Sequence, residues 1–512
     1  MKNLDLRGFR LPKLLLVVLL LSATISSCKK DRNNSTDPEV PLSGPDQEFY
    51  ALSNNNLLKF NAKDVSKSIS SVPISGLPGT EKILSIDFRP ATGELYGVSN
   101  ASKLYVIRLN GAARAIGTGF SPTLTGTIAS IDFNPTVDRI RLITNTGQNL
   151  RIHPETGAVA ATDGNINGVS NVMISGAAYT NSKAGASSTT LFDIDISTKK
   201  LYKQDPPNEG KLIEVGSLGV EIGSTSSFDI SPDNSKALAA GTTNGLSNIY
   251  TISLETGKAT LAGKFPMSTP IEGIAIPTDP VAYAVDNANN FLIFNPMSPA
   301  TVIAKPITGL AASESIVGID FRPANGQIYA LGSLSHLYTV NTATGALTPV
   351  GAGTLTTALL GSSFGFDFNP TVDRIRIVSN TGQNLRLHPE TGAVVSVDGI
   401  LKPGNPSISA AAYTNNFMSA TETVLFDIDH ATDKLYKQTP PNDGTLVEVG
   451  NLGVNAESTN GFDIGSASGT AYAILTVGGV NKIYTINLTT GSATAIGDFS
   501  KTVSAMTVGL GL

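Results

Sequence analysis

The residues best suited to bind an anion lie in two short polar strings. In RIRL, from Arg139, and NLRIH, from Asn149, polar residues occupy alternate positions. Successive side chains of a β-strand point to opposite faces, so two strands here would place Arg139 beside Arg141, and Arg151 beside His153. Guanidinium groups bind carboxylates through paired hydrogen bonds. We therefore expect Arg141, Arg151 and His153 either to bind an anionic ligand, such as an acidic sugar, or to lie next to acids of the protein itself.

The same polar segment occurs twice in the chain. Residues 133–159 recur as residues 368–394 with four substitutions, which establishes an internal duplication. The second copy supplies Arg376, Arg386 and His388 as the equivalent candidates for an anion site. Further repeated strings, such as LFDID at Leu191 and Leu425, keep the register, so the body consists of two homologous halves.

Buried arginines need acids, and the sequence offers them in strands. Each half carries three aspartates that follow an apolar residue: Asp87, Asp132, Asp229, Asp320, Asp367 and Asp463. We favour an interpretation in which Arg139 with Asp132, and Arg374 with Asp367, form partly buried Arg–Asp pairs between neighbouring sheets. The alternatives are the anionic ligand and a solvated surface.

Other motifs are weak. Residues 163–168 match the first half of a calcium loop, but Ile174 stands where the bidentate glutamate belongs. Residues 361–365 fit G-x-S-x-G, yet they lead into a predicted strand rather than a helix. The four histidines lack metal-ligand spacing, and no dinucleotide or P-loop string occurs. We expect no metal, no cofactor and no catalytic residue that the sequence can identify.

The composition is that of a folded, turn-rich body. The 512 residues include 50 Gly and 28 Pro but no Trp, and only 15% are charged. This argues against a helical bundle and against disorder. A formal net charge of −5 makes nucleic acid an improbable partner. The single cysteine excludes a disulfide within the body.

The N-terminus has the features of a lipoprotein leader. Basic residues precede an apolar run from Leu14 to Leu21, and Ile25-Ser26-Ser27-Cys28 resembles a bacterial lipobox. We predict a signal peptide over residues 1–27, lipidation of Cys28 and a flexible tether over 28–45. Several acyl chains on Cys28 would give stable membrane anchoring. The lysines that follow the cysteine resemble the start of outer-membrane lipoproteins, including those exported to the cell surface.

A period of about 40–45 residues runs within each half. Nine units of four short strands begin near Ile83, Ala129, Ile174, Ser226, Glu272, Ile316, Phe364, Ile408 and Asn460, which is typical of β-propeller blades. Three strands at the start, from Phe49, Leu57 and Ser70, and one unpaired strand at the end, from Val503 to Leu510, account for the tenth. The predicted fold is all-β, with ten four-stranded blades. They form either two tandem five-bladed propellers, over 46–277 and 278–512 with residues 272–276 completing the first ring, or one ten-bladed ring, which the short linker 277–280 would suit.

The strings NPTVDRIR, NTGQNLR and HPETG resemble a family of unknown function found in secreted and lipid-anchored bacterial proteins, and more distantly YVTN-type surface propellers. That resemblance implies fold and location but no catalytic residues. We expect a cell-envelope binding or scaffold protein that presents propeller loops to a protein or glycan. The alternative is an extracytoplasmic hydrolase or lyase acting on a saccharide or lactone, with His153 and His388 or a channel acid as base; an enzyme is the less favoured class.

Overall fold

The structure is a computed structural model, and it describes residues 42–512 apart from 224, 267–268 and 459. The predicted signal peptide, Cys28 and most of the predicted tether lie outside the described residues. In the part of the chain that is described, no helix is long and apolar enough to cross a membrane. Almost all regular structure is β-strand, in ten four-stranded antiparallel sheets.

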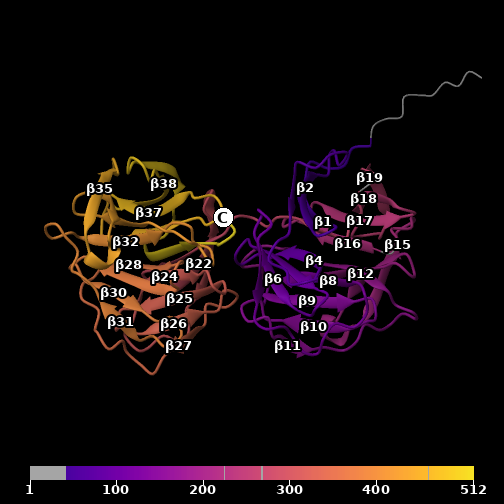
Figure 1. The fold of residues 1–512 in the computed structure, drawn as a ribbon, viewed down its shortest axis with the longest axis horizontal. Helices are drawn as coiled ribbons and strands as arrows, with labels where there is room; N and C mark the ends of the chain where they lie inside the picture. Colours follow the sequence, from indigo (N-terminus) through magenta and orange to yellow (C-terminus); the bar gives the residue numbers. More distant parts are fainter. Residues whose placement is uncertain (1–41, 224, 267–268, 459) are drawn as a thin grey trace, which may run out of the picture. The chain divides into compact units, whose positions relative to one another are not determined.

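Five sheets come from the first half of the chain (Figure 1). The first sheet contains β20 (Gly273–Ala275), β1 (Glu48–Ser53), β2 (Asn56–Asn61) and β3 (Ser70–Pro73), in that order. The next four are β4 (Ile83–Phe88), β5 (Leu95–Ser99), β6 (Leu104–Ile107) and β7 (Ala113–Ile116); β8 (Ala129–Asn134), β9 (Arg139–Thr144), β10 (Asn149–Ile152) and β11 (Val159–Thr162); β12 (Ile174–Tyr179), β13 (Leu191–Asp195), β14 (Lys200–Gln204) and β15 (Leu212–Ser217), with the 3-10 turn η1 (Pro207–Glu209); and β16 (Thr225–Ile230), β17 (Ala237–Thr243), β18 (Leu246–Ile252) and β19 (Ala259–Lys264).

The second half repeats this order. Its first sheet contains β40 (Val503–Val508), β21 (Ala282–Asp286), β22 (Asn290–Asn295) and β23 (Ser298–Pro306). The others are β24 (Ile316–Arg322), β25 (Gln327–Gly332), β26 (Leu337–Val340) and β27 (Leu347–Val350); β28 (Phe364–Asn369), β29 (Arg374–Ser379), β30 (Asn384–Leu387) and β31 (Val394–Val397); β32 (Ile408–Tyr413), β33 (Leu425–Asp429), β34 (Lys434–Gln438) and β35 (Leu446–Asn451), with η2 (Pro441–Asp443); and β36 (Asn460–Ile464), β37 (Ala471–Val477), β38 (Val480–Ile486) and β39 (Ala493–Asp498).

Each half closes on itself. Strand β20 pairs antiparallel with β1, placing Ala51 opposite Ile274, and it packs against the inner strands β4 and β16. In the second half β40 pairs with β21, with Val285 opposite Ala505, and packs against β24 and β36. The late strand of each half therefore supplies the missing inner strand of its first blade. This confirms the predicted propeller fold in its two-ring form and excludes the single ten-bladed ring.

The core lies between blades because each sheet is apolar on both faces. One cluster joins Tyr96 and Leu104 of the second blade to Phe133 and Leu142 of the third, and all four residues are buried. The rings of Tyr96 and Phe133 meet edge to face, with centroids 5.2 Å apart. Because both faces of a sheet are buried, its strands are nearly continuous apolar runs. A polar residue within such a strand needs a hydrogen-bond partner.

Buried polar contacts join the two halves. The Tyr283 hydroxyl donates to the Ala91 carbonyl oxygen over 2.9 Å, and Arg89 Nη1 donates to the Gly326 carbonyl oxygen over 3.1 Å. The Tyr283 hydroxyl and the Arg89 guanidinium are inaccessible to water. Because a buried donor without an acceptor is costly, these contacts favour one defined arrangement at this junction.

Candidate functional site

Aspartates and serines on the inner strands tie neighbouring blades together. Inner strands of adjacent blades do not form a ladder with each other, so their backbone N–H groups need side-chain acceptors. In the first propeller the acceptors follow a Ser-x-Asp pattern, since residues two apart point the same way. Ser85 accepts from the Ile131 N–H over 3.0 Å and Asp87 from the Phe133 N–H over 2.7 Å. The same bonds run from Ser130, Asp132, Ser227 and Asp229 to the next blade.

The second propeller keeps the aspartates and replaces the serines by glycine. Asp320, Asp367 and Asp463 accept from the N–H groups of Phe368, Tyr413 and Val508 over 2.8, 3.1 and 2.7 Å. At the serine positions stand Gly318, Gly365 and Gly461. A Cβ atom on Gly365 would lie 2.4 Å from the Cβ of Ala411, which no real structure tolerates. At the positions of these serines, the second propeller therefore has closer packing between blades in place of hydrogen bonds.

The three aspartates of each propeller converge. In the first propeller one carboxylate oxygen each of Asp87, Asp132 and Asp229 lies within 4.8 Å of the other two, and all three residues are buried. Burial raises the pKa of Asp87 well above its usual value, and the neighbouring Asp229 raises it further. Burial also raises the pKa of Asp229, to about 7. Because charges of one sign this close cannot all form, the group holds protons at neutral pH.

The second triad has the same geometry, and its pKa values are likewise raised. The space beside it is very small. Carboxylate oxygens of Asp320, Asp367 and Asp463 lie within 4.8 Å of one another, and burial raises the pKa of Asp463 to about 6. The cavity between the five inner strands of this ring measures about 10 Å³, close to the room that one water needs. Both triads thus hold neighbouring blades together, and a saccharide cannot reach the second triad along this cavity.

Arg141 is the centre of a hydrogen-bonded network between the third and fourth blades. Its Nη1 donates to Asp163 Oδ2 over 2.6 Å and to Asn149 Oδ1 over 2.8 Å. Its Nη2 donates to Asn208 Oδ1 over 2.8 Å, and its Nε to the Tyr179 hydroxyl over 3.2 Å. The Arg141 side chain is 2% exposed. In the second propeller Arg376 makes the same four contacts with Asp398, Asn384, Asn442 and Tyr413.

A single acid serves two arginines in each network. Arg151 Nε and Nη2 donate hydrogen bonds to the two carboxylate oxygens of Asp163 over 2.8 and 2.9 Å, and Arg386 donates to Asp398 in the same way. Asp163 is the first residue of the calcium-like string, so the structure gives it a different role, as the shared partner of Arg141 and Arg151. Asp163 lies in the loop directly after β11, and strand periodicity does not predict partners in loops.

The expected pairs Arg139–Asp132 and Arg374–Asp367 are not what the structure shows. Arg139 Nη1 donates to the backbone oxygen of Asp138 over 2.8 Å, and Arg374 Nη1 to that of Asp373 over 2.8 Å. Asp132 and Asp367 lie in the inner-strand triads instead. The register explains the difference: Arg139 stands opposite Asn134, whereas Asp132 stands opposite Arg141 and points toward the next blade.

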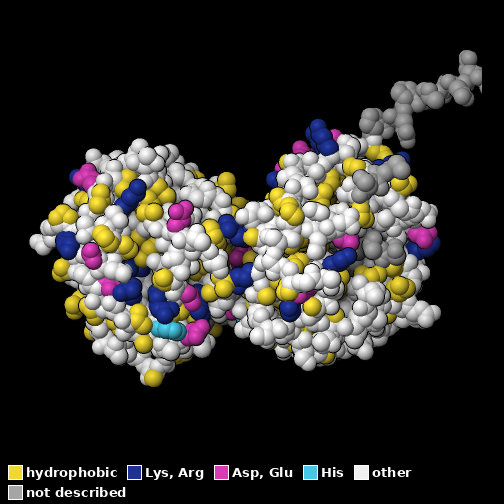
Figure 2. Space-filling view, viewed as in Figure 1, with side chains coloured by type: hydrophobic (Ala, Val, Ile, Leu, Met, Phe, Trp, Pro, Cys, Tyr) yellow, Lys and Arg dark blue, Asp and Glu magenta, His cyan; other side chains and the backbone are white. Residues whose placement is uncertain are grey.

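A further Arg–Asp–Glu staple was not identified from the sequence. Arg89 Nε donates to Asp138 Oδ1 over 2.9 Å, and its Nη2 lies 3.0 Å from Glu155 Oε1. Arg322 makes the equivalent contacts with Asp373 and Glu390. The duplicated string DFRP, which places an arginine directly after an inner strand, was the available signal. On the face shown in Figure 2, positive and negative side chains lie close together on the second propeller.

The two candidate histidines lie beside these staples. His153 Nδ1 accepts from the Glu155 N–H over 3.3 Å, and His388 Nδ1 from the Glu390 N–H over 3.2 Å. Burial lowers the pKa of His153 to about 4, and Arg139 and Arg89 lower it further. His153 is therefore neutral at physiological pH and a weak base, with one ring nitrogen already engaged by the backbone.

Two more aspartates are buried without partners. Asp193 and Asp427 are inaccessible to water, and neither carboxylate oxygen of either has a hydrogen-bond partner among the described residues. Burial raises the pKa of both to about 8, against the opposing effect of Arg141 and Arg376. Each is therefore mainly protonated at neutral pH. Arg141 and Arg376 bind the loop aspartates Asp163 and Asp398 instead.

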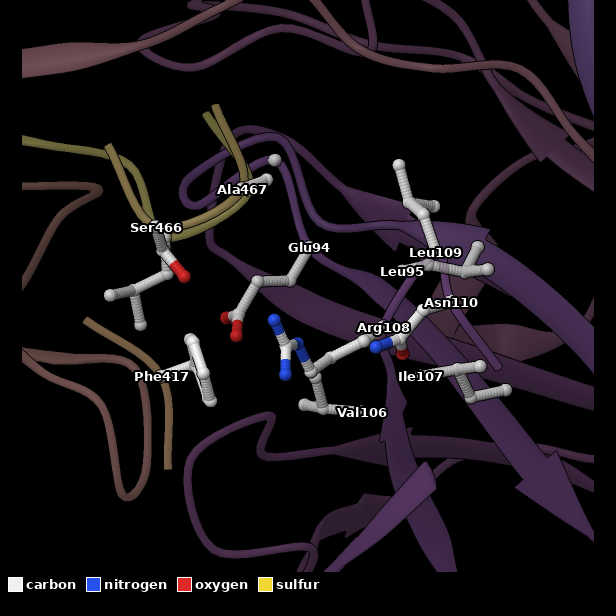
Figure 3. Close-up of a pocket in the computed structure, with 13 residues that line it drawn as sticks. Glu94, Leu95, Val106, Ile107, Arg108, Leu109, Asn110, Phe417, Ser466 and Ala467 are labelled. Carbon is white, nitrogen blue, oxygen red and sulfur yellow. The ribbon is translucent and has the colours of Figure 1, made fainter. Parts of the chain in front are cut away.

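A pocket of about 190 Å³ contains an unpaired buried polar group. Figure 3 shows Glu94 and Arg108 pointing into it from the first propeller, with Phe417 and Ser466 from the second. Leu95 belongs to its apolar lining. Sequence reasoning missed this pocket because its two sides are more than 300 residues apart along the chain.

The polar groups of this pocket are incompletely satisfied. Glu94 Oε2 is buried without a hydrogen-bond partner among the described residues, and burial raises the pKa of Glu94. The Arg108 guanidinium lies 3.5 Å from the centre of the Phe417 ring, a cation–π contact. Within residues 42–512 as described, it makes no ion pair. A ligand that both donates and accepts hydrogen bonds could satisfy both groups.

The fold and the duplication define a tandem β-propeller protein. The family model of a domain of unknown function, DUF4394, matches residues 56–275 and 290–509, one copy for each half. The chain therefore belongs to this family, as the resemblance had implied. It matches none of the curated proteins with which it was compared.

Solved structures similar to the chain include two of the extracellular domain of BT4673 from B. thetaiotaomicron, described in one case as a one component system and in the other as a hybrid two component system. Sequence identities are 11% and 13%, and the TM-score is 0.26 for both. The matches cover 89% of this chain, which spans only 65% of those chains. At this TM-score the likeness supports no inference about function.

Proposed function

We propose that this protein is a non-enzymatic binding protein of the bacterial cell envelope, anchored through a lipidated Cys28, that takes a glycan in the pocket of Glu94, Arg108 and Phe417. The observation that carries the proposal is this pocket, where a buried carboxylate oxygen and an arginine lack polar partners among the described residues. Pockets with a mainly apolar lining and a few convergent polar groups are the usual ligand sites of proteins.

The size and lining suit one sugar ring. A volume of about 190 Å³ exceeds the ~150 Å³ cavity that holds benzene in another protein. Leu109, which is 43% exposed, and the partly exposed Phe417 offer apolar contacts to the carbon face of a ring. Glu94 accepts hydrogen bonds from hydroxyl groups, while Arg108 donates to hydroxyl or carboxylate oxygens. The remaining sugars of a longer glycan would extend into solvent.

Binding fits the geometry better than hydrolysis or elimination. A general base must reach a substrate position and have a pKa near the working pH. His153 is neutral with a pKa of about 4, and Asp320 of the second propeller accepts a backbone N–H beside a cavity of about 10 Å³. No observation among the described residues favours the hydrolase or lyase alternative.

A glycan array probed with the labelled full chain tests the proposal. Wild type should bind a subset of glycans, and Phe417→Ala and Arg108→Ala should each weaken that binding at least tenfold. Lys258→Ala, an exposed change of charge on the same propeller, is the matched control and should bind like wild type. Thermal unfolding curves of the variants check that each is folded. Absence of binding by wild type, or unchanged binding by both pocket variants, would refute the site.

A further inference from the structure

We infer that each propeller has its own binding site besides the shared glycan pocket, a small arginine pocket on its third blade that takes the carboxylate of an acidic saccharide. In the second propeller the pocket has a volume of about 140 Å³, and its lining includes Arg374, Arg376, Arg386, Tyr413 and Asn442. The site lies within one propeller. It goes beyond the glycan pocket proposed above and does not depend on it.

The pocket has an excess of positive charge. Three guanidinium groups line it, and no carboxylate belongs to its lining. The nearest acid, Asp398, is shared by Arg376 and Arg386, and Asp373 is taken by Arg322. One carboxylate thus balances two arginines, and the charge of Arg374 is not balanced by any ion pair within the described residues. An anion is the natural occupant of such a surface.

Hydrogen-bond donors remain for that anion. Arg386 binds Asp398 through Nε and Nη2, so its Nη1 amino group has no partner within the described part of the chain. Arg374 uses only Nη1, toward the backbone oxygens of Val372 and Asp373, which leaves its Nη2 for a ligand. Both side chains are partly exposed, whereas Arg376 is buried and already bound to four partners.

Comparison of the two halves helps to distinguish residues kept for ligand binding from residues kept for structure. Every residue that lines this pocket has an identical counterpart in the first half, although the two halves differ at other positions of the clamps and loops. The network explains why Arg141 and Arg376 are both kept. It does not explain Arg139 and Arg374, whose guanidinium groups touch only neighbouring backbone oxygens. Arg139 lies close enough to Asp138 and Glu155 for its charge to favour lower pKa values in both, but it forms no ion pair with either within the described residues. Its remaining N–H donors are therefore open to an external anion.

The surroundings favour a carboxylate on a sugar. A guanidinium fork matches the two oxygens of a carboxylate. Val372 at the rim is 55% exposed and presents an apolar surface for ring carbons. His388 is not part of the lining. Of the residues first considered for an anion, Arg386 and its counterpart Arg151 are therefore the ones that reach a ligand.

Isothermal titration of the full chain with D-glucuronate tests this inference. Wild type should bind D-glucuronate but not D-glucose, more weakly as salt rises. Arg374→Ala should reduce the saturating heat by about half, and Arg139→Ala with Arg374→Ala should abolish it. Lys501→Ala removes an exposed lysine of the second propeller and should change nothing. Arg374 is at the surface, so the variants should keep the wild-type melting temperature.

Three results would overturn the inference: no heat with D-glucuronate, an unchanged titration for the double variant, or equal binding of sulfate and phosphate, which would remove the assignment to an acidic saccharide. The Phe417→Ala variant separates this site from the pocket of Glu94. It should titrate D-glucuronate like wild type even if its glycan-array signal is lost, and the glycan pocket can fail while the arginine pocket stands.

Discussion

The buried aspartates Asp193 and Asp427 should make the protein less stable as the pH rises. Each is inaccessible to water and has its pKa raised to about 8 by burial, whereas the same carboxyl in the unfolded chain has a pKa of about 3.9. Between these values the folded state holds a proton that the unfolded state has lost. The stabilisation is complete below about pH 4 and disappears as the pH rises through about 8.

The magnitude follows from the proton difference. One extra proton in the folded state lowers the free energy of unfolding by about 1.4 kcal/mol per pH unit, so the two carboxyls together account for roughly 5 kcal/mol between pH 5 and pH 7. Asparagine imitates the protonated carboxyl in shape and charge. Asp193→Asn combined with Asp427→Asn should therefore remove about 2.7 kcal/mol per pH unit from the slope.

Urea unfolding followed by circular dichroism between pH 5 and pH 8 measures this slope. The double variant should gain stability relative to wild type as the pH rises. A matched control is Asp163→Asn, which removes the charge from a carboxylate that Arg141 and Arg151 bind, and which should destabilise the protein across the same range. Parallel pH profiles for wild type and the double variant would refute the assignment of protonated, buried carboxyls.

Three further predictions concern the network, the anchor and the rings. Arg141→Ala should lower the free energy of unfolding by about 2–4 kcal/mol, because it leaves the shared acid Asp163 with one partner fewer; an unchanged melting temperature would show that the network contributes nothing. Cys28→Ala should move the protein from the membrane fraction to the soluble fraction, and unchanged detergent partitioning would argue against lipidation. Residues 46–277 expressed alone should give a monomer with one cooperative unfolding transition, and an aggregated product would contradict an independent first propeller.

The fold could be predicted from the sequence because its signals are local and repeated. The expected blade starts at Ala129, Ile174 and Phe364 coincide with the first residues of β8, β12 and β28. Strand alternation and turn residues act over a few positions, and the duplication shows them twice. Closure by residues 272–276 was also correct, as β20 shows.

The side-chain partners could not be predicted in the same way. Asp163 meets Arg141 through a loop, and Asn208 reaches it from the turn η1 of the next blade. Such contacts depend on how loops cross between blades, which strand periodicity does not encode. The pocket of Glu94 and Phe417 depends on a junction between distant segments, and the Arg139–Asp132 pairing failed because the register places Asp132 on the inner-strand triad.

Ring closure is tested most directly by cross-linking in the Cys28→Ala background. Ala51 and Ile274 are paired across β1 and β20, so Ala51→Cys with Ile274→Cys should form an intramolecular disulfide, seen as faster migration without reductant. Ala51→Cys with Met506→Cys should not, because Met506 pairs with Ala284, the counterpart of Ala51 in the other ring. A disulfide in the second pair and none in the first would mean that the chain closes as a single ring, and the two-propeller account would be wrong.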